Sequence, residues 1–529
     1  MGGVWSAERL YPALKSNNLL GTYEYSDFPM TTASYGVKPG EHIPGSVLHA
    51  YLTDYAANFG VLDRIRFQSR VEAVQRSEGK EWRLTVSSQD QESQVETEKL
   101  IVATGLTSEP FIPAFEGSED CNISIFHSKD FHQHASSVKT TSRAVVLGGH
   151  KSAWDAAYVY ATAGAEVHLV MRESGHGPIW MAPPYVTPLK KWLEKLVHTR
   201  FLTWLSPCIW GAADGFASVR NFLHASIVGR FIVDSFWSIL ANDVLSLNGY
   251  DNHPETKKLK PWSNPFFIAS SLSILNYETD FFDLVRRGKI KVHVADIKSL
   301  SGDKVCLSNG EHISTDVLLC ATGWRHHPPI KFLPEGNDEE LGLPYYSDES
   351  DKEVIKADSE ILSRFPRLKD QPAPNPKAKV QLAAPSNSPA AVKPNQPYRL
   401  YRFMVPPSTI HDRNIGFAGA LMTISTALIA QTQALWLSAY FDGKIQLDED
   451  VNYEAILHSQ YGKWRYPAGR GAHFPDFVFD AIPYLDLLLS QLGLRSHRKK
   501  GKLAEVFEPY GPQDYPGLND EWRMRHAKS

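Results

Sequence analysis

The residues best placed to do chemistry form a glycine turn between an apolar strand and a helix. Gly148 and Gly149 make the turn, and Lys151 and Ser152 follow where the helix begins. Free backbone N–H groups and the dipole at the start of a helix bind phosphate groups. We therefore expect Gly148 to permit the tight turn and Gly149 to permit the close approach of a dinucleotide pyrophosphate.

The next strand of this unit ends at Met171 and is followed by Arg172. An acidic residue at this place would bind the ribose 2′-hydroxyl of NAD, whereas an arginine suits the 2′-phosphate of NADP. Arg172 therefore favours NADPH, and the alternative is a surface cation at a strand end. The unit departs from the G-x-G-x-x-G/A pattern where His150 stands for the second glycine.

Two other segments resemble each other, because each is an apolar strand that ends in Ala-Thr-Gly. Thr104 and Gly105 end the first copy, and Thr322 and Gly323 end the second. A glycine at a strand end lets the backbone approach a dinucleotide closely, because it has no Cβ. One copy lies on either side of the 143–172 unit. This arrangement predicts that one dinucleotide-binding domain is inserted into another.

The elements that must position these residues are predicted from hydrophobic periodicity. One helix is expected over residues 44–59, and the helix of the dinucleotide unit over 152–163, with Gly164 as its C-cap. Strands are expected at residues 64–76, 81–87, 100–103, 144–147, 167–171, 290–294, 304–307 and 317–321. The predicted fold class is α/β, with two Rossmann-like dinucleotide-binding domains.

Four other segments have a less regular pattern. Residues 175–290 are rich in aromatic side chains, and we expect a packed helical insertion, with a lid or a membrane-surface element as the alternative. Residues 366–398 are rich in Pro, Ala, Lys and Asn, which is typical of a flexible surface insertion. Residues 415–441 are apolar and predicted to be helical. The basic segment 495–502 is expected to be a solvated surface.

Composition excludes several classes of function. The 529 residues suffice for two or three domains, and a net charge of −4 gives no support to nucleic-acid binding. The four cysteines, Cys121, Cys208, Cys306 and Cys320, have neither CxxC nor metal-ligand spacing, so we expect a reducing compartment and no metal site. Without a signal-peptide pattern or a membrane span, the chain is predicted to be cytoplasmic, and its shorter apolar stretches leave docking on a membrane surface open. The oligomeric state stays undetermined.

Several motifs, taken in order, resemble the flavin-containing monooxygenase family, the class B flavoprotein monooxygenases that include Baeyer–Villiger enzymes. The matching segments are residues 2–5 (GGVW), 11–17 (YPALKSN), 25–29 (YSDFP), 127–131 (HSKDF), 321–324 (ATGW) and 417–420 (FAGA). The resemblance covers nearly the whole chain apart from residues 366–398. It implies an FAD-binding domain formed by residues 1–139 and 326–529, and an NADP-binding domain formed by 140–325 with its helical insertion.

The resemblance also implies roles for individual residues. NADPH would reduce FAD, and the reduced flavin would take up O₂ as a C4a-hydroperoxide that must be kept dry and hydrogen-bonded. Asn17 matches the amide beside that adduct and is the candidate catalytic residue, with a helix cap as the alternative. Gly3, Trp5 and Asp27 match flavin-side positions, and the alternative for Asp27 is a turn residue. His127 matches the signature histidine, which implies a hinge contact with the NADP domain.

The implied function is insertion of one oxygen atom from O₂ into a small lipophilic molecule, by N- or S-oxygenation or by Baeyer–Villiger oxidation. Family members of this kind often serve fungal secondary metabolism. The family's first glycine motif, which holds the FAD pyrophosphate, would precede Met1, so a truncated, non-catalytic nucleotide-binding remnant is the alternative. Cys121 and Ile123 also replace a Phe and a Gly of the family signature. A pyridine nucleotide–disulfide oxidoreductase is disfavoured, because the sequence has no paired redox cysteines.

Overall fold

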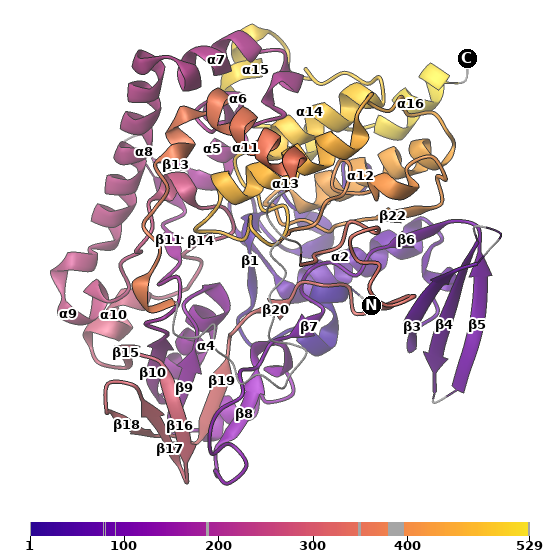
Figure 1. The fold of residues 1–529 in the computed structure, drawn as a ribbon. Coiled ribbons are helices and arrows are strands. Elements are labelled where there is room, and N and C mark those ends of the chain that lie inside the picture. The colour runs from indigo at the N-terminus through magenta and orange to yellow at the C-terminus, as the bar shows by residue number, and fades with distance from the viewer. Residues whose placement is uncertain are drawn as a thin grey trace.

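A parallel five-stranded sheet, in the order β15-β10-β9-β19-β8, forms the centre of one half of the molecule. The computed structural model describes residues 2–77, 79, 81–89, 91–186, 190–346, 351–378 and 396–526. The strands of this sheet are β15 (Ile290–Val294), β10 (Glu166–Met171), β9 (Arg143–Leu147), β19 (Val317–Cys320) and β8 (Ser124–His127). They lie at the lower left of Figure 1. Apolar layers cover both faces, which explains why β9 and β19 read as continuous apolar runs.

The predicted strand–turn–helix–strand unit is confirmed in β9, α4 (Lys151–Thr162) and β10. Helix α4 begins one residue earlier and ends one residue earlier than expected, and Gly164 follows it with a φ of +105°. Ala153, Ala157 and Ala161 are buried, and these small side chains let the helix lie close to the sheet. The sequence therefore locates both the turn and the face of the helix that packs.

One antiparallel sheet packs on this centre, and a second, mixed sheet lies apart from it. The strands β16 (Ile297–Ser301), β17 (Lys304–Leu307) and β18 (His312–Ser314) cover one face of the parallel sheet. A separate sheet of β21 (Lys331–Leu333), β3 (Ser69–Arg76), β4 (Trp82–Ser88) and β5 (Gln91–Thr97) lies at the right of Figure 1. The predicted strand at 81–87 matches β4, whereas the strand predicted at 64–76 begins only at Ser69, because a 3₁₀ helix at Leu62–Arg64 and a turn at 67–68 precede it. Strand β5 was not predicted, because its side chains are mostly exposed and carry no apolar alternation.

The first part of the chain forms short elements, and one of its strands pairs in parallel with a strand from the C-terminal region. These elements are β1 (Lys15–Leu19), β2 (His42–Pro44), the expected helix α2 (Gly45–Asn58), β6 (Leu100–Val102) and β22 (Ile415–Phe417). Strand β6 was expected to be a buried strand, and this is wrong for Ile101, which is 46% exposed. The reason is that β6 pairs only with β22 in the described sheets, so one edge and one face remain open.

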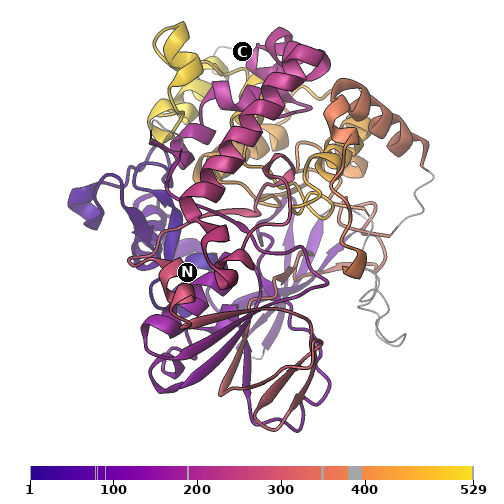
Figure 2. The same cartoon turned by 90° about the vertical axis from the view of Figure 1, so that its left-hand side faces the viewer.

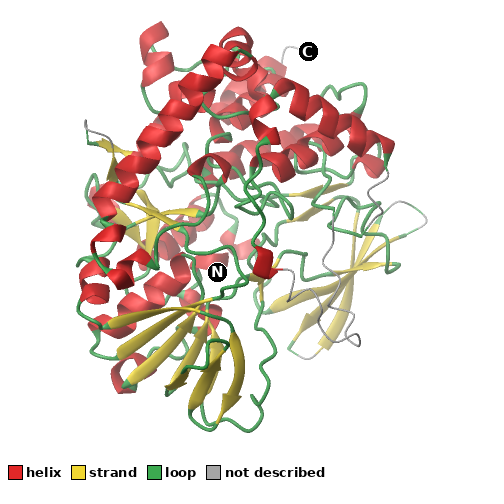
Figure 3. Ribbon diagram, turned by 60° about the vertical axis from the view of Figure 1, so that its left-hand side comes forward, coloured by secondary structure: helices red, strands yellow, loops and turns green. Residues whose placement is uncertain are grey.

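The insertion predicted at 175–290 is largely helical and packs on the C-terminal helices, as Figures 1 and 3 show. Its main helices are α5 (Leu193–Val197), α6 (Arg200–Trp204), α7 (Ala217–Ala225), α8 (Ile227–Asn248) and α10 (Phe281–Arg286). Their partners are α11 (Lys352–Arg364), α12 (Thr426–Phe441), α13 (Val451–Arg465) and α14 (Ala481–Gln491). The two groups share the largest apolar core of the molecule.

Helix α8 has one packed face and one apolar face without cover. Val233, Trp237 and Leu240 are buried in the large core, whereas Ile227 is 79% and Phe231 is 73% exposed. Figure 2 shows α8 as a long helix across the face of the molecule that is turned toward the viewer. No single helix in the described residues has the length and apolar composition of a membrane span. Helix α7 and the 227–252 segment reach that threshold only together, with a bend of 86° between them.

Three of the less regular predictions need correction. Residues 415–425 are not helical, because β22 and a turn precede α12. In the predicted flexible insertion, residues 379–395 lie outside the described residues, while Leu368 and Tyr398 at its ends are buried. The basic segment 495–502 is only partly solvated: Arg498 pairs with Glu521, and Lys499 pairs with Asp514.

Candidate functional site

The glycine turn after β9 is held tightly against the end of β19. A Cβ on Gly148 would lie 2.6 Å from the Ala321 carbonyl oxygen and 3.1 Å from the Ala153 Cβ. The residue also has a φ of +150°. Only glycine fits this position without displacing the backbone, which supports the predicted tight turn.

The structure gives an additional reason for a glycine at position 149. A Cβ at this position would lie 2.9 Å from the carbonyl oxygen of Gly177, in the segment after β10. The Ile179 N–H donates a hydrogen bond of 3.0 Å to the Gly149 carbonyl. The close approach that Gly149 permits is therefore made by the chain itself on this side of the turn, because the insertion begins here.

Two adjoining hollows lie on the flavin side, each of about 380 Å³. The first is lined by Gly3, Trp5, Thr104 and Gly105, and the second by Asn17, among others. The two hollows share the lining residues Val4, Trp5, Tyr23, Thr107, Thr426 and Ala430. They therefore form one continuous depression, called the double hollow below. The structure thus brings together four of the predicted flavin contacts and the candidate catalytic amide.

Lys151 and Ser152 also line the second hollow, and they are the first two residues of the dinucleotide-unit helix α4. The Lys151 ammonium forms a close ion pair with Asp155 and lies 4.6 Å from the centre of the Tyr277 ring. Asp155 accepts further hydrogen bonds from the hydroxyls of Tyr11 at 2.8 Å and Tyr277 at 2.9 Å. Lys151 is therefore fixed in the wall of the hollow that contains Asn17.

Asn17 lies in β1, and the insertion fixes its side chain. The Ser273 hydroxyl donates to Asn17 Oδ1 at 3.1 Å, and Asn276 Nδ2 donates to the Ser16 carbonyl at 3.0 Å. No protein acceptor meets the Asn17 amide nitrogen in the part of the chain that the structure describes. An oriented amide with a free N–H donor facing a cavity can hydrogen-bond an acceptor there without releasing a proton.

A buried carboxyl group beside Asn17 was not predicted. Glu194 of α5 is 5% exposed and accepts hydrogen bonds from Asn18 Nδ2 at 2.7 Å and from the Leu19 N–H at 2.9 Å. The Thr22 hydroxyl makes a third, close hydrogen bond to it. Burial raises the pKa of Glu194 to about 7, against the opposing effect of these donors. The contact joins residues 175 positions apart, so no local pattern in the sequence indicates it.

The structure leaves several other predicted residues outside the two hollows. Asp27 is half-buried, its Oδ1 lacks a hydrogen-bond partner among the described residues, and burial raises its pKa. Its neighbour Tyr25 lines the first hollow and stacks on Tyr55 with ring centres 4.2 Å apart. A flavin-side role for Asp27 would therefore act through this aromatic wall.

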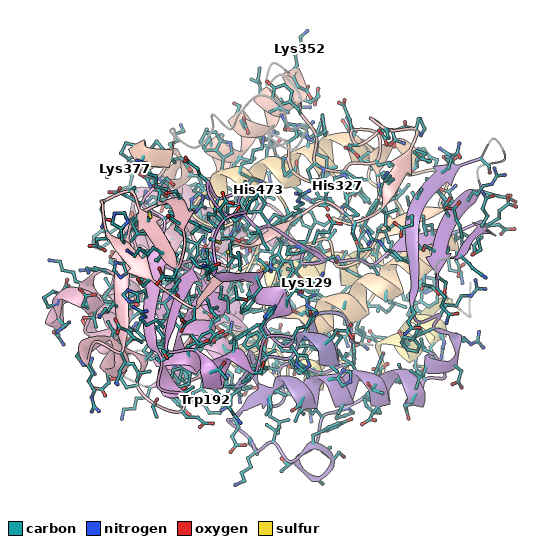
Figure 4. All side chains as sticks on the ribbon, turned by 90° about the horizontal axis from the view of Figure 1, so that it is seen from below. Lys129, Trp192, His327, Lys352, Lys377 and His473 are labelled. Atoms are coloured by element: carbon teal, nitrogen blue, oxygen red, sulfur yellow. The ribbon has the colours of Figure 1, made fainter. Side chains whose placement is uncertain are left out.

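His127 is fully buried at the end of β8, where it contacts the second Ala-Thr-Gly turn. Its Nδ1 accepts from the Lys129 N–H at 3.0 Å, and its ring packs edge-on against Trp324 at 4.9 Å. Burial lowers the pKa of His127 to about 4, so the ring is neutral near pH 7. Lys129, labelled in Figure 4, donates from Nζ to the Ser108 carbonyl at 2.9 Å. These contacts suit a hinge between the two nucleotide regions better than proton transfer.

The second Ala-Thr-Gly turn lies at the carboxyl edge of the central sheet. The Thr322 hydroxyl donates to the Phe111 carbonyl, and Gly323 has a φ of +87°. Arg172 leaves the same edge at the end of β10. A further residue, Arg470 from the C-terminal region, lies beside Gly323, and its Nη2 is 4.0 Å from the position that a Cβ there would take. Sequence reasoning missed Arg470, because it lies in a loop without a motif.

The sheet edge and the double hollow together define a flavoprotein fold with two dinucleotide-binding regions. Solved structures share this fold. Cyclohexanone monooxygenase from Rhodococcus sp. Phi1 bound to NADP⁺ matches with a TM-score of 0.58 and 13% identity, over 93% of this chain and 90% of that chain. A closed crystal structure of cyclohexanone monooxygenase also gives 0.58, at 13% identity, over 94% and 91%.

The sequence comparisons identify the family. The chain is 32% identical over 550 residues to the FAD-dependent monooxygenase resA of Aspergillus sclerotiorum, covering 99% of this chain and 91% of that protein. It is 33% identical over 536 residues to an FAD-dependent monooxygenase of Pyrenophora dematioidea, covering 96% and 93%. The chain belongs to the family of FAD-dependent monooxygenases, which confirms the predicted resemblance.

One family model, described as pyridine nucleotide-disulphide oxidoreductase, matches residues 20–202. This segment includes the β9–α4–β10 unit and therefore the dinucleotide fold. Cys121, Cys208, Cys306 and Cys320 are all free thiols, and Cys208 and Cys320 are buried. Burial raises the pKa of both buried thiols, which keeps them protonated. The cysteines therefore give no support to disulfide chemistry.

Proposed function

We propose that this chain is an FAD- and NADPH-dependent monooxygenase that inserts one oxygen atom of O₂ into a small lipophilic molecule. The observation that carries the proposal is the composition of the second hollow, where Asn17 from the flavin side meets Lys151 and Ser152 from the dinucleotide helix. Hydride transfer requires the nicotinamide and the flavin to face each other, so their binding regions must share such a cavity.

The lining of the double hollow suits FAD. Gly3, Gly105 and Gly419 line it with φ values of +55°, +65° and +71°, and nothing lies within 4 Å of the position of a Cβ on any of them. Such bare backbone lets an aromatic ring system approach closely. Trp5 and Tyr23 add flat apolar walls, and the Trp5 indole N–H donates to the Tyr23 hydroxyl at 3.1 Å. When bound there, FAD supplies the redox and oxygen-activating chemistry.

The residues around FAD would orient the reactants and exclude water. The Asn17 N–H would hydrogen-bond an acceptor beside the flavin without supplying a proton. Leu421, Met422 and Ile429 line the second hollow, and such an apolar wall favours a lipophilic substrate and keeps out water. We leave N- or S-oxygenation and Baeyer–Villiger oxidation as the two reaction types that this pocket admits.

We assign NADPH to the carboxyl edge of the central sheet, in the position that open α/β sheets use for dinucleotides. The start of α4 and Gly148 would receive the pyrophosphate, and Arg172 the 2′-phosphate. This assignment divides the chain as expected from the sequence, with residues 140–325 for NADP and residues 1–139 and 326–529 for FAD. The separate apolar clusters around each sheet support that division, whereas the helical insertion of 140–325 shares its core with the C-terminal helices.

The absorption spectrum of the purified chain tests the proposal. We expect visible absorption bands of bound flavin that persist through gel filtration. NADPH added under nitrogen should bleach these bands, because it reduces the flavin. A colourless protein that still binds NADPH would instead support the alternative, a non-catalytic nucleotide-binding protein. Product analysis with sulfide, amine and cyclic ketone probes then distinguishes the two reaction types.

We also propose that the end of the molecule at which α7, α8 and α15 (Lys502–Phe507) meet contacts an anionic membrane surface (Figure 1). Ile227 and Phe231 are exposed there, and Phe201 packs on the exposed Phe507 at 5.4 Å. Arg495, Lys500 and Lys502 of the basic segment 495–502 are exposed next to this apolar end, which suits anionic headgroups, whereas Arg498 and Lys499 are paired within the protein. Sedimentation with anionic vesicles should fall for the double variant Ile227→Ser and Phe231→Ser, and unchanged sedimentation would refute the contact.

A further inference from the structure

The loop that follows α13 carries Arg470 to the carboxyl edge of the central sheet. Two glycines flank it: a Cβ on Gly469 would lie 2.9 Å from Asp476 Oδ2, and one on Gly471 would lie 2.0 Å from the Gly462 carbonyl oxygen. The Arg470 N–H donates to Asp476 Oδ2 at 2.8 Å. The backbone of Arg470 is therefore held rigidly, and the side chain is the part of this loop that can act.

Figure 4 locates this loop through His473, whose N–H donates to the Arg470 carbonyl at 2.8 Å. The Arg470 side chain points toward the second Ala-Thr-Gly turn, with Nη2 beside Gly323. Burial and the positive charge of Arg470 lower the pKa of His150 to about 3 and that of His326 to about 4. Arg470 therefore lies among the residues that follow β9 and β19.

The guanidinium of Arg470 lies near a second cation, the Arg172 side chain. Burial lowers its pKa, and the charge of Arg172 lowers it further. The negative charge of Asp476 raises the pKa of Arg470 in the opposite direction. However, the carboxylate oxygens of Asp476 accept hydrogen bonds from the Ser270 backbone N–H, the Ser270 hydroxyl and the Arg470 backbone N–H, not from the guanidinium. Among the described residues, no carboxylate forms an ion pair with the guanidinium. A cation in this situation destabilises the folded protein unless an anion joins it.

We propose that Arg470 binds the pyrophosphate of the pyridine nucleotide and so completes, from the C-terminal region, the site formed by the glycine turn and the start of α4. The inference rests on the proposed use of NADPH at this edge. Helix α4 has 12 residues, and its first N–H groups and dipole favour a phosphate at the same point. The planar guanidinium adds two parallel hydrogen bonds to phosphate oxygens, which a lysine would not reproduce.

Two other roles for Arg470 agree less well with the structure. A structural counter-ion would require a carboxylate at the guanidinium, and Asp476 is engaged with backbone and hydroxyl donors instead. A contact with the flavin phosphates would require Arg470 to line the double hollow, and it lines neither part. The remaining anion is the dinucleotide at the sheet edge.

Equilibrium binding to the purified full chain tests the inference with two probes, NADP⁺ and NAD⁺. Arg470→Gln should weaken both by the same factor, about tenfold to hundredfold, because both contain the pyrophosphate. Arg172→Ala should weaken NADP⁺ alone, because only NADP⁺ has the 2′-phosphate. Arg470→Lys should recover part of the lost affinity. Arg495→Gln, which removes an exposed arginine, should leave both affinities unchanged.

The midpoint of thermal unfolding distinguishes an Arg470 that binds the nucleotide from an Arg470 that is needed for the fold. Because Arg470 is a buried cation near Arg172 and forms no ion pair with a carboxylate among the described residues, Arg470→Gln should keep or raise the midpoint while it weakens binding; the loss of a residue needed for the fold would lower it. A measurement on the unaltered protein does not depend on the folding of any variant: NAD⁺ should protect Arg470 from modification by phenylglyoxal, read by peptide mapping.

Three results would overturn the inference while leaving the proposed function intact. They are unchanged affinities in Arg470→Gln, a loss confined to NADP⁺, and modification of Arg470 that NAD⁺ does not slow. If the unaltered chain binds neither nucleotide, the proposed use of NADPH fails, and the inference fails with it.

Discussion

The substitution Glu194→Gln offers a direct test of the buried cluster beside Asn17. Burial raises the pKa of Glu194 from 4.5 to about 7. At about 1.4 kcal/mol per pKa unit, this corresponds to about 3 kcal/mol of free energy between the two protonation states. The folded protein binds the proton more tightly than the unfolded chain. The contribution of Glu194 is therefore fully present below pH 4.5 and is lost as the pH rises toward 7 and above it.

The expected result is a difference in pH dependence between the two proteins. The thermal midpoint of the unaltered protein should fall more steeply from pH 5 to pH 8 than that of Glu194→Gln, which cannot ionise. The infrared difference between the two proteins should contain a protonated-carboxyl band that titrates near pH 7. Asp476 and Asp486, whose pKa values burial raises to about 6, are common to both proteins and cancel in that difference. Glu92→Gln, at an exposed position, serves as the control. The neighbouring His198 has a lowered pKa through burial, which gives a slope of opposite sign.

Two outcomes would refute this reasoning. Equal slopes in both proteins would mean that Glu194 does not change its protonation between the folded and unfolded states. A carboxyl band that titrates near the ordinary pKa of glutamate would mean that the Asn18, Leu19 and Thr22 donors stabilise the charged form enough to cancel its burial.

Three further predictions concern the nucleotide sites. Arg172→Ala should raise KM for NADPH much more than KM for NADH, and equal increases would exclude contact with the 2′-phosphate. Asn17→Ala should leave flavin reduction by NADPH unchanged but increase hydrogen peroxide release per NADPH, whereas Asn309→Ala in an exposed turn should not; unchanged coupling would remove Asn17 from the reaction centre. Gly148→Ala should lower stability by about 1–3 kcal/mol, because its Cβ meets the Ala321 carbonyl oxygen, and should weaken dinucleotide binding. Gly164→Ala, at a φ of +105° with nothing within 4 Å, isolates the backbone strain, and equal losses in both variants would contradict the steric argument.

The parts of the fold that could be predicted are those with a local signal. The β9–α4–β10 unit is specified by an apolar run, a glycine turn and helical spacing within thirty residues, so its position was predicted nearly to the residue. Helix α2 was predicted for the same reason. Strand β5 was missed because its residues are polar and its stability comes from pairing with β4.

The parts of the site that were missed depend on contacts between distant segments. Glu194 meets Leu19 across 175 positions, and Arg470 reaches a turn at Gly323. Neither residue lies in a motif, and a buried carboxyl or an unpaired guanidinium cannot be distinguished from a surface charge in a sequence alone. The sequence predicted that position 149 needs a glycine. Only the structure shows that the Gly177 carbonyl oxygen leaves no room for a Cβ at this position.

The insertion after β10 has a consequence for how such an enzyme can change during evolution. It contributes Ser273 to the orientation of Asn17, Glu194 to the strand beside it, and Gly177 to the glycine turn. An exchange of this segment between relatives, made to alter substrate choice, would therefore also alter flavin-side and dinucleotide-side geometry. The insertion therefore sets geometry on the flavin side and on the dinucleotide side together. Chimeras should recover activity only when the residues that the insertion contacts are exchanged with it.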